Sequence, residues 1–103
     1  MNTSDIARDA CRIGGLKALE FFNQRDQLTI DLKGPQDYAS EADRTVENVM
    51  IDYLKRHFPN DGFLGEESVE IKNERQWVID PIDGTTNFIR GLPYFCTTLA
   101  LVE

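Results

Sequence analysis

The stretch that decides the fold runs from Trp77 to Phe88 and reads WVIDPIDGTTNF. Its first three residues form a short apolar, β-favouring run of the kind that makes a buried strand. The proline that follows Asp80 keeps it out of helical geometry, so Asp80 should lie extended at the end of that strand. Asp83 resembles the N-cap of a helix whose first N–H groups, on Gly84 and Thr85, have no partner within the helix.

Two carboxylates, on Asp80 and Asp83, therefore converge on a helix N-terminus, where the helix dipole and the N–H groups attract an anion such as phosphate. Carboxylates that face a phosphate repel it unless a cation lies between them. A hard cation with oxygen ligands, Mg²⁺ first, suits this arrangement. The same residue types are also common in ordinary turns and helix caps, so the stretch alone leaves a purely structural role open.

Spacing excludes two other acidic motifs. The calcium-binding loop has acidic residues at alternating positions, whereas Asp80 and Asp83 are three apart. The haloacid-dehalogenase phosphatases carry Asp-x-Asp-Gly-Thr after a strand, and this chain has one residue too many between its aspartates. The difference matters, because in that family one aspartate is a nucleophile, whereas here both would be ligands.

Composition limits the class of protein. The 103 residues are 41% hydrophobic and 28% charged, which is typical of one small globular domain or of part of a larger one. A net charge of −7 argues against nucleic acid and anionic membranes as partners. We find neither a signal peptide nor an apolar run long enough to span a membrane. Cys11 and Cys96 form no metal or redox motif, so we expect both to be packing residues of a reduced, cytoplasmic protein.

Hydrophobic periodicity predicts two long helices. The first spans residues 4–23, and the glycine pair at 14–15 indicates a close contact with a neighbouring element. The second spans residues 40–57, with Ser40 and Asp43 forming something like a capping box at its start. Asp43 could instead reach out to a site, but the sequence favours the cap.

Short β-favouring runs predict the remaining elements. A short helix after Asp83 ends at Gly91, and His57 is expected to lie exposed in the last turn of the second long helix. Glu66 follows directly after one predicted strand, where it fits either a surface turn or a site. The predicted strands cover residues 28–32, 63–65, 77–79 and 95–102.

Three motifs, in order, carry a resemblance to a known family. They are Asp37 with Asp43, then GEES at residues 65–68, then DPIDGTTNF at residues 80–88, which is highly specific. Together they look like the inositol monophosphatase family of Mg²⁺-dependent, lithium-sensitive phosphatases. The resemblance covers essentially the whole chain but only the N-terminal part of the family. Family members are more than twice as long, and this sequence, with Trp77 as its one tryptophan, lacks their C-terminal WDxA-like motif.

The resemblance implies a set of metal ligands. Glu66 and Asp80 would bind the first metal together with the backbone carbonyl of Ile82. Asp80 would also bridge to a second metal, which Asp83 helps to hold, and two or three Mg²⁺ ions would be bound in all. Glu67 would lie near the metals. The last ligand of the second metal would come from the missing C-terminal half.

The resemblance also implies catalytic and substrate-binding roles. Thr85 and Glu66 would orient the water that attacks phosphorus, and Asp43 would hydrogen-bond Thr85. The substrate phosphate would contact Asp83, Gly84 and Thr85. No covalent intermediate is needed, which agrees with the absence of any Cys, Ser or His placed as a nucleophile.

Fold and function follow as expectations from the resemblance. Residues 1–103 would form the N-terminal helices and first strands of a layered α/β sugar-phosphatase fold, with an open edge that pairs with the missing half or with a second copy in a homodimer. The activity would be Mg²⁺-dependent hydrolysis of a small polyol phosphate such as inositol 1-phosphate by metal-activated water. The alternatives are a histidinol-phosphate or nucleotide 3′-phosphate phosphatase, and a truncated, non-catalytic metal-binding or dimerising module.

Overall fold

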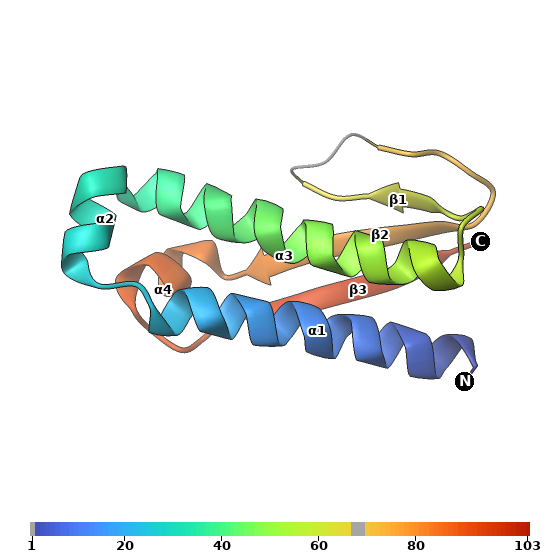
Figure 1. Ribbon diagram of the computed structural model, residues 1–103, viewed down its shortest axis with the longest axis horizontal. Coiled ribbons are helices and arrows are strands. Elements are labelled where there is room, and N and C mark those ends of the chain that lie inside the picture. The colour runs from blue at the N-terminus through green and yellow to red at the C-terminus, as the bar shows by residue number, and fades with distance from the viewer. Residues whose placement is uncertain (1, 67–69) are drawn as a thin grey trace.

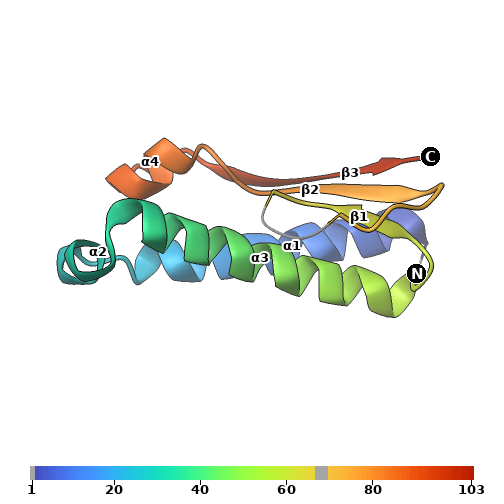
Figure 2. The same ribbon diagram turned by 90° about the horizontal axis from the view of Figure 1, so that it is seen from above.

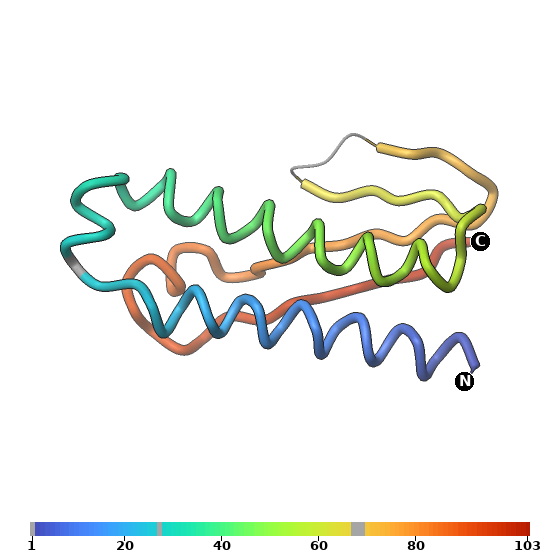
Figure 3. Tube along the Cα trace, in the orientation of Figure 1, coloured from blue at the N-terminus to red at the C-terminus, as the bar shows by residue number. Residues whose placement is uncertain are grey.

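The computed structural model describes residues 2–66 and 70–103, in which two long helices lie against one face of a three-stranded sheet (Figures 1 and 2). Figure 3 traces the chain from α1 through α3 into the sheet and shows the two termini at the same end of the molecule. The elements are α1 (Thr3–Asn23), α2 (Gln27–Lys33), α3 (Pro35–His57), β1 (Gly62–Leu64), β2 (Gln76–Asp83), α4 (Thr85–Arg90) and β3 (Cys96–Val102).

The central strand β2 contains the stretch that the sequence singled out. β1 pairs parallel to it, with Phe63 opposite Trp77, and β3 pairs antiparallel to it, with Leu101 opposite Trp77. The strand predicted at 77–79 is therefore confirmed, but it runs on to Asp83. The pairing with β3 is irregular between Asp80 and Asp83, and such a bulge is where a sheet tolerates a proline.

The core lies between the sheet and the helices α1 and α3. Gly14 of α1 is buried, and a Cβ there would overlap the side chain of Met50 on α3, so the predicted close approach is confirmed at this glycine. Gly15 has open space beside it. The larger buried side chains of this core are Val46, Met50, Leu54, Phe63, Trp77, Ile79, Ile82 and Phe88.

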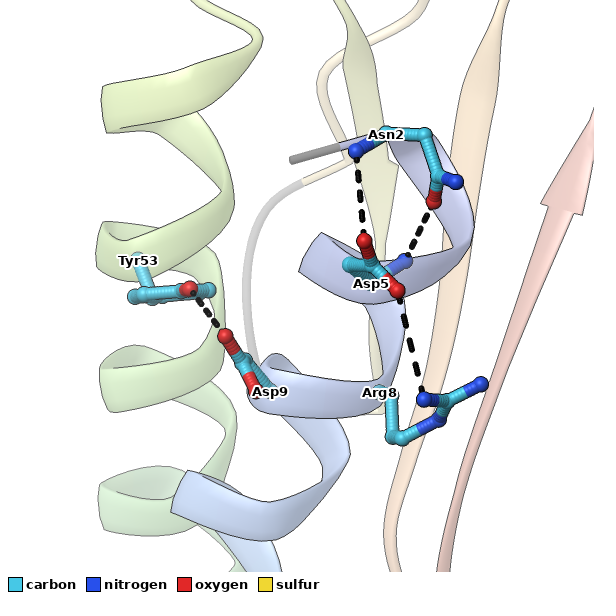
Figure 4. A network of polar contacts seen from close by, with 5 residues as sticks. All are labelled: Asn2, Asp5, Arg8, Asp9 and Tyr53. Carbon is cyan, nitrogen blue, oxygen red and sulfur yellow. Dashed lines mark hydrogen bonds and ion pairs between the residues drawn. The ribbon is translucent and has the colours of Figure 1, made fainter.

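Polar contacts fix the start of α1 and join it to α3 (Figure 4). The Asn2 side chain accepts the Asp5 N–H at 2.9 Å, and Arg8 lies 3.9 Å from the Asp5 carboxylate. Further along, the Tyr53 hydroxyl of α3 donates to Asp9 of α1 at 3.2 Å. The helix predicted at 4–23 is confirmed, and it begins one residue earlier.

The strand predicted at residues 28–32 is wrong, because these residues form the short helix α2. The Asp26 side chain caps this helix by accepting the Thr29 N–H at 2.7 Å. Ile30 is buried, while Leu28 and Leu32 are exposed.

The start predicted for the second long helix is also wrong. α3 begins at Pro35, after Gly34 with φ of 86°, which is five residues before Ser40. A proline at the first helical position has no N–H to leave unpaired, so it begins a helix readily. Asp43 therefore lies inside the helix and is buried, and it is not part of a capping box.

The predictions for His57 and for the two cysteines differ in outcome. His57 is exposed in the last turn of α3, as expected, with its ring 4.8 Å from that of Tyr53. Cys11 is half-buried, which raises the pKa of its thiol, but Cys96 is exposed, so a packing role is wrong for it. In the part of the chain that the structure describes, no helix is long and apolar enough to cross a membrane.

Candidate metal and phosphate site

Asp80 lies in β2 at the bulge, opposite Thr98 of β3. It is half-buried, and its Oδ1 atom is buried without a hydrogen-bond partner among residues 2–66 and 70–103. The pKa of Asp80 is raised, first because burial removes water from the carboxylate and second because the charge of Asp83 lies nearby. A buried carboxylate oxygen beside a second carboxylate is a favourable place for a cation.

Glu66 lies in a bend two residues after the end of β1 and is exposed. Leu64, the last residue of β1, pairs with Val78 of β2 in parallel, and Asp80 lies two residues further along β2. Because the two strands are parallel, the chain leaves β1 towards the end of the sheet at which Asp80 lies. Phe63 is buried towards the helices, so Leu64 projects to the face that α1 and α3 do not cover.

The turn from β2 into α4 holds the other predicted residues. The Thr85 hydroxyl donates to the backbone carbonyl of Ile82 at 3.2 Å. Gly84 is the N-cap of α4 and has φ of 99°, and a Cβ there would also clash with the Tyr94 carbonyl. Asp83 is the exposed last residue of β2, so its predicted role as N-cap is wrong.

The N-terminus of α4 still offers backbone donors. Phe88 N–H donates to the Gly84 carbonyl at 3.0 Å, which closes the first turn of the helix. The N–H groups of residues 85–87 therefore have no acceptor inside α4. These N–H groups follow Asp80 and Asp83 within a few residues of the chain, as the prediction of a phosphate site requires.

Asp43 is buried in α3, where it is only 6% exposed, and α3 as a whole packs against both β2 and α4. The ring of Tyr38, five residues earlier in α3, stacks on Phe88 of α4 with centroids 6.3 Å apart. A buried position on the helix that packs against α4 is compatible with the role that the resemblance implies for Asp43 towards Thr85.

Asp80 and Asp83 lie close enough for the charge of one to affect the other, but the predicted ligands are not assembled into a complete site. Within residues 2–66 and 70–103, no group of three or more His, Cys, Asp or Glu side chains is arranged to hold a metal ion. Glu66 and Asp83 are both exposed, and Glu67 lies outside the described residues. The buried Oδ1 of Asp80 and its raised pKa nevertheless fit a hard cation.

Three residues near the site were missed by sequence reasoning. The Asn87 side chain donates to the Tyr94 carbonyl at 2.9 Å, which ties α4 to the segment before β3. The Thr97 hydroxyl donates to the Pro81 carbonyl at 2.7 Å and holds the bulge. The third, Glu47, is buried in α3. The polar run after Gly84 pointed to Asn87, but nothing local in the sequence marks the other two.

Comparison with known proteins gives consistent matches. The sequence matches the model of the inositol monophosphatase family over residues 2–103. It is 44% identical over 100 residues to the Nus factor SuhB of Xylella fastidiosa (strain Temecula1), covering 96% of this chain and 36% of that protein. It is 46% identical over 83 residues to the inositol-1-monophosphatase of Rhizobium meliloti (strain 1021), covering 78% and 31%.

Solved structures agree on the fold. The extragenic suppressor protein SuhB of Bartonella henselae superposes with a TM-score of 0.80 at 31% identity, over 97% of this chain and 38% of that one. An inositol monophosphatase from Zymomonas mobilis gives 0.75 at 39% identity, over 96% and 38%. The predicted layered α/β fold is therefore confirmed. The chain spans about a third of the length of the curated relatives that it matches.

Proposed function

Because this chain belongs to the inositol monophosphatase family, we propose that it forms part of the active site of a metal-dependent phosphomonoesterase. The proposed substrate is a small polyol phosphate such as inositol 1-phosphate, which the names of several relatives support. The observation that carries the proposal is Asp80, whose buried Oδ1 has no hydrogen-bond partner in the described chain and whose pKa is raised beside Asp83.

The metal ligands in this proposal come from two strands. Asp80, Asp83 and the carbonyl of Ile82 belong to β2, and Glu66 lies two residues after the end of β1, the strand that pairs with β2. When bound, Mg²⁺ would neutralise charge on the phosphate and lower the pKa of a water molecule. We propose two or three ions, and a further ligand from outside these 103 residues.

The residues around α4 would hold the substrate and the attacking water. Backbone N–H groups of Gly84 and Thr85 would donate to the phosphate oxygens. The Thr85 hydroxyl has one hydrogen, which the Ile82 carbonyl accepts in this structure and which the Asp43 carboxylate would accept in the proposed site. In either arrangement the hydroxyl oxygen can accept a hydrogen from the water. Glu66 would accept the other hydrogen, and Asp43 would fix the Thr85 side chain.

A non-catalytic metal-binding or dimerising module is the second candidate. It is favoured by strand β3, which in the described residues pairs only with β2 and so offers an edge to a second copy. Both candidates predict Mg²⁺ binding, and only the first predicts turnover.

The test is Mg²⁺-dependent release of phosphate from inositol 1-phosphate, with Asp80→Asn as the test variant and Asp52→Asn, an exposed acid on α3, as the control. We expect Asp80→Asn to lose roughly 100-fold or more of the rate, because it removes a charge-stabilising group, and Asp52→Asn to lose little. Histidinol phosphate and a nucleotide 3′-phosphate belong in the same assay as competing substrates.

Calorimetry with Mg²⁺ tests the binding that both candidates predict. Binding that Asp80→Asn abolishes, without phosphate release by the 103-residue chain, would mean that the site is incomplete in these residues, and only a lack of release by a chain of the relatives' full length as well would favour the non-catalytic module. A folded chain that takes up no Mg²⁺ would contradict both.

A further inference from the structure

Among the described residues, two charged side chains are buried, and both are acids of α3. Asp43 is 6% exposed and Glu47 is 0% exposed. They are four residues apart, so they lie on one face of the helix, one turn from each other. Burying a carboxylate is unfavourable unless it makes specific polar interactions, so its place in a core calls for an explanation.

Glu47 lies against the end of β1. A Cβ built on Gly65 would overlap the carboxylate of Glu47, with Oε1 as its nearest atom. The space beside Gly65 is therefore taken by this carboxylate, and any larger residue at position 65 would displace it. Gly65 is the residue between the last residue of β1 and Glu66.

The chain connects this contact directly to the candidate metal site. Phe63 and Gly65 face α3, and Leu64 faces the opposite side of the sheet. Glu66 is the next residue after Gly65, so a shift or rotation of the backbone at Gly65 would move Glu66. The carboxylate of Glu47 thus contacts the residue that precedes a proposed metal ligand.

We propose that Glu47 is a positioning residue for the metal site, whose buried carboxylate fixes the backbone at Gly65 and so holds Glu66 beside Asp80. This inference rests on the proposed function, because it assigns Glu47 to the same site. An apolar side chain of similar volume would fill the space but could accept no hydrogen bond from the turn that follows β1.

The test compares three variants of the 103-residue chain. Glu47→Leu removes the carboxylate and keeps most of the volume, Glu47→Gln keeps one acceptor oxygen, and Met50→Ala is the control. Met50 is equally buried in α3, and its side chain packs against Gly14 of α1. The measurements are the Mg²⁺ dissociation constant by calorimetry, amide hydrogen exchange at residues 64–66, and thermal unfolding.

We expect Glu47→Leu to weaken Mg²⁺ binding by roughly tenfold or more, the usual effect of removing a group that orients a ligand. Exchange at residues 64–66 should become faster in the same variant. Glu47→Gln should retain most of the affinity, and Met50→Ala should unfold at a lower temperature with unchanged affinity. Parent-like affinity in Glu47→Leu, or an equal loss in Met50→Ala, would overturn the inference.

Two further outcomes keep the result decisive. If the parent chain binds no Mg²⁺, the proposed function fails. Amide exchange at residues 64–66 still tests whether Glu47 fixes the backbone there, and unchanged exchange in Glu47→Leu would overturn that positioning role. If Glu47→Leu does not fold, Gly65→Ala tests the contact from the other side. It should weaken Mg²⁺ binding to a similar extent, and an unchanged affinity would count against the inference.

Discussion

Asp80 is the residue on which the proposed cation site depends most. Its Oδ1 is buried with no hydrogen-bond donor in the described chain, and burial together with Asp83 raises its pKa. In the unfolded chain the same carboxylate is surrounded by water. The folded state therefore disfavours the charged form of Asp80, and it does so at the place where a cation is proposed.

The sign of the resulting pH dependence follows from linkage. Between the ordinary pKa of Asp80 and its raised value, the folded chain retains a proton that the unfolded chain has lost, so stability falls as pH rises through this window. At neutral pH and without divalent cations, we expect Asp80→Asn to raise the unfolding temperature by a few degrees. This difference should disappear below about pH 3.9, where the carboxylate is protonated in both states.

Thermal unfolding in EDTA and in Mg²⁺ checks this expectation. Mg²⁺ should raise the unfolding temperature of the parent chain and of Asp52→Asn, since a ligand that binds only the folded state stabilises it. It should leave Asp80→Asn unchanged. If Asp80→Asn is less stable than the parent chain in EDTA, the argument that the charge of Asp80 destabilises the folded chain without a cation is wrong.

Gly84 allows a second prediction at this scale. Its φ of 99° is strained for any residue with a Cβ, and the added atom would also approach the Tyr94 carbonyl. We expect Gly84→Ala to destabilise the chain by about 1–3 kcal/mol. Gly15→Ala is the matched control, because Gly15 lies inside α1 with open space beside it and Ala there should stabilise by roughly 0.5–1 kcal/mol. Chemical denaturation measures both, and equal stability of Gly84→Ala and the parent would refute the argument.

At the scale of elements, α2 depends on a single cap. The Asp26 carboxylate accepts the Thr29 N–H, which lowers the pKa of Asp26. A lowered pKa gives stability that is present above the ordinary pKa and is lost as pH falls through the lowered value. We expect Asp26→Ala, or acidification of the parent, to speed amide exchange in residues 29–33 while α1 and α3 stay protected. Asp52→Ala, which removes an exposed acid from α3, should have little effect on exchange in α2. Loss of protection in all helices together would show that α2 is not an independent unit.

Elements with a long hydrophobic pattern or a distinctive terminal residue were predictable from the sequence, whereas short elements without such a residue were not. α1 shows its apolar stripe over many residues, and the end of α4 at Gly91 is marked by a residue that accepts a left-handed conformation. The alternation at residues 28–32 covers little more than one turn of a helix, so it fits a short helix as well as a strand. The cap at Asp26 decides between them. The start of α3 was missed because Gly-Pro also occurs in loops.

The same distinction applies to the site. Asp80 and Asp83 could be found because they share one continuous stretch with the turn that positions them. The role inferred for Glu47 depends on a contact between positions 47 and 65, and a carboxylate in an amphipathic helix gives no sequence signal that it is buried. Packing between distant segments had to be seen in the structure.

At the scale of the whole molecule, one face of the sheet has no covering layer in the described chain. Figure 2 shows α1 and α3 on the same side of the three strands. The other face includes apolar side chains that are partly or largely exposed, among them Leu64 at 37% and Val102 at 53%. In the described residues β3 pairs only with β2, so it also presents an unpaired edge.

This arrangement predicts concentration-dependent self-association of the 103-residue chain. An exposed strand edge next to an apolar face is a template for pairing with a second copy. Val102→Lys places a charge on the edge strand and should weaken association roughly tenfold, about 1.4 kcal/mol. Leu32→Lys makes a similar change in charge on α2, where the leucine is 79% exposed, and should leave association unchanged. Sedimentation velocity over a range of concentrations measures the effect. Equal weakening by Val102→Lys and Leu32→Lys would indicate a general effect of charge. A third variant, Leu64→Lys, places the charge on the exposed face of the sheet. Weakening by this variant alone would place the contact on that face instead of the β3 edge.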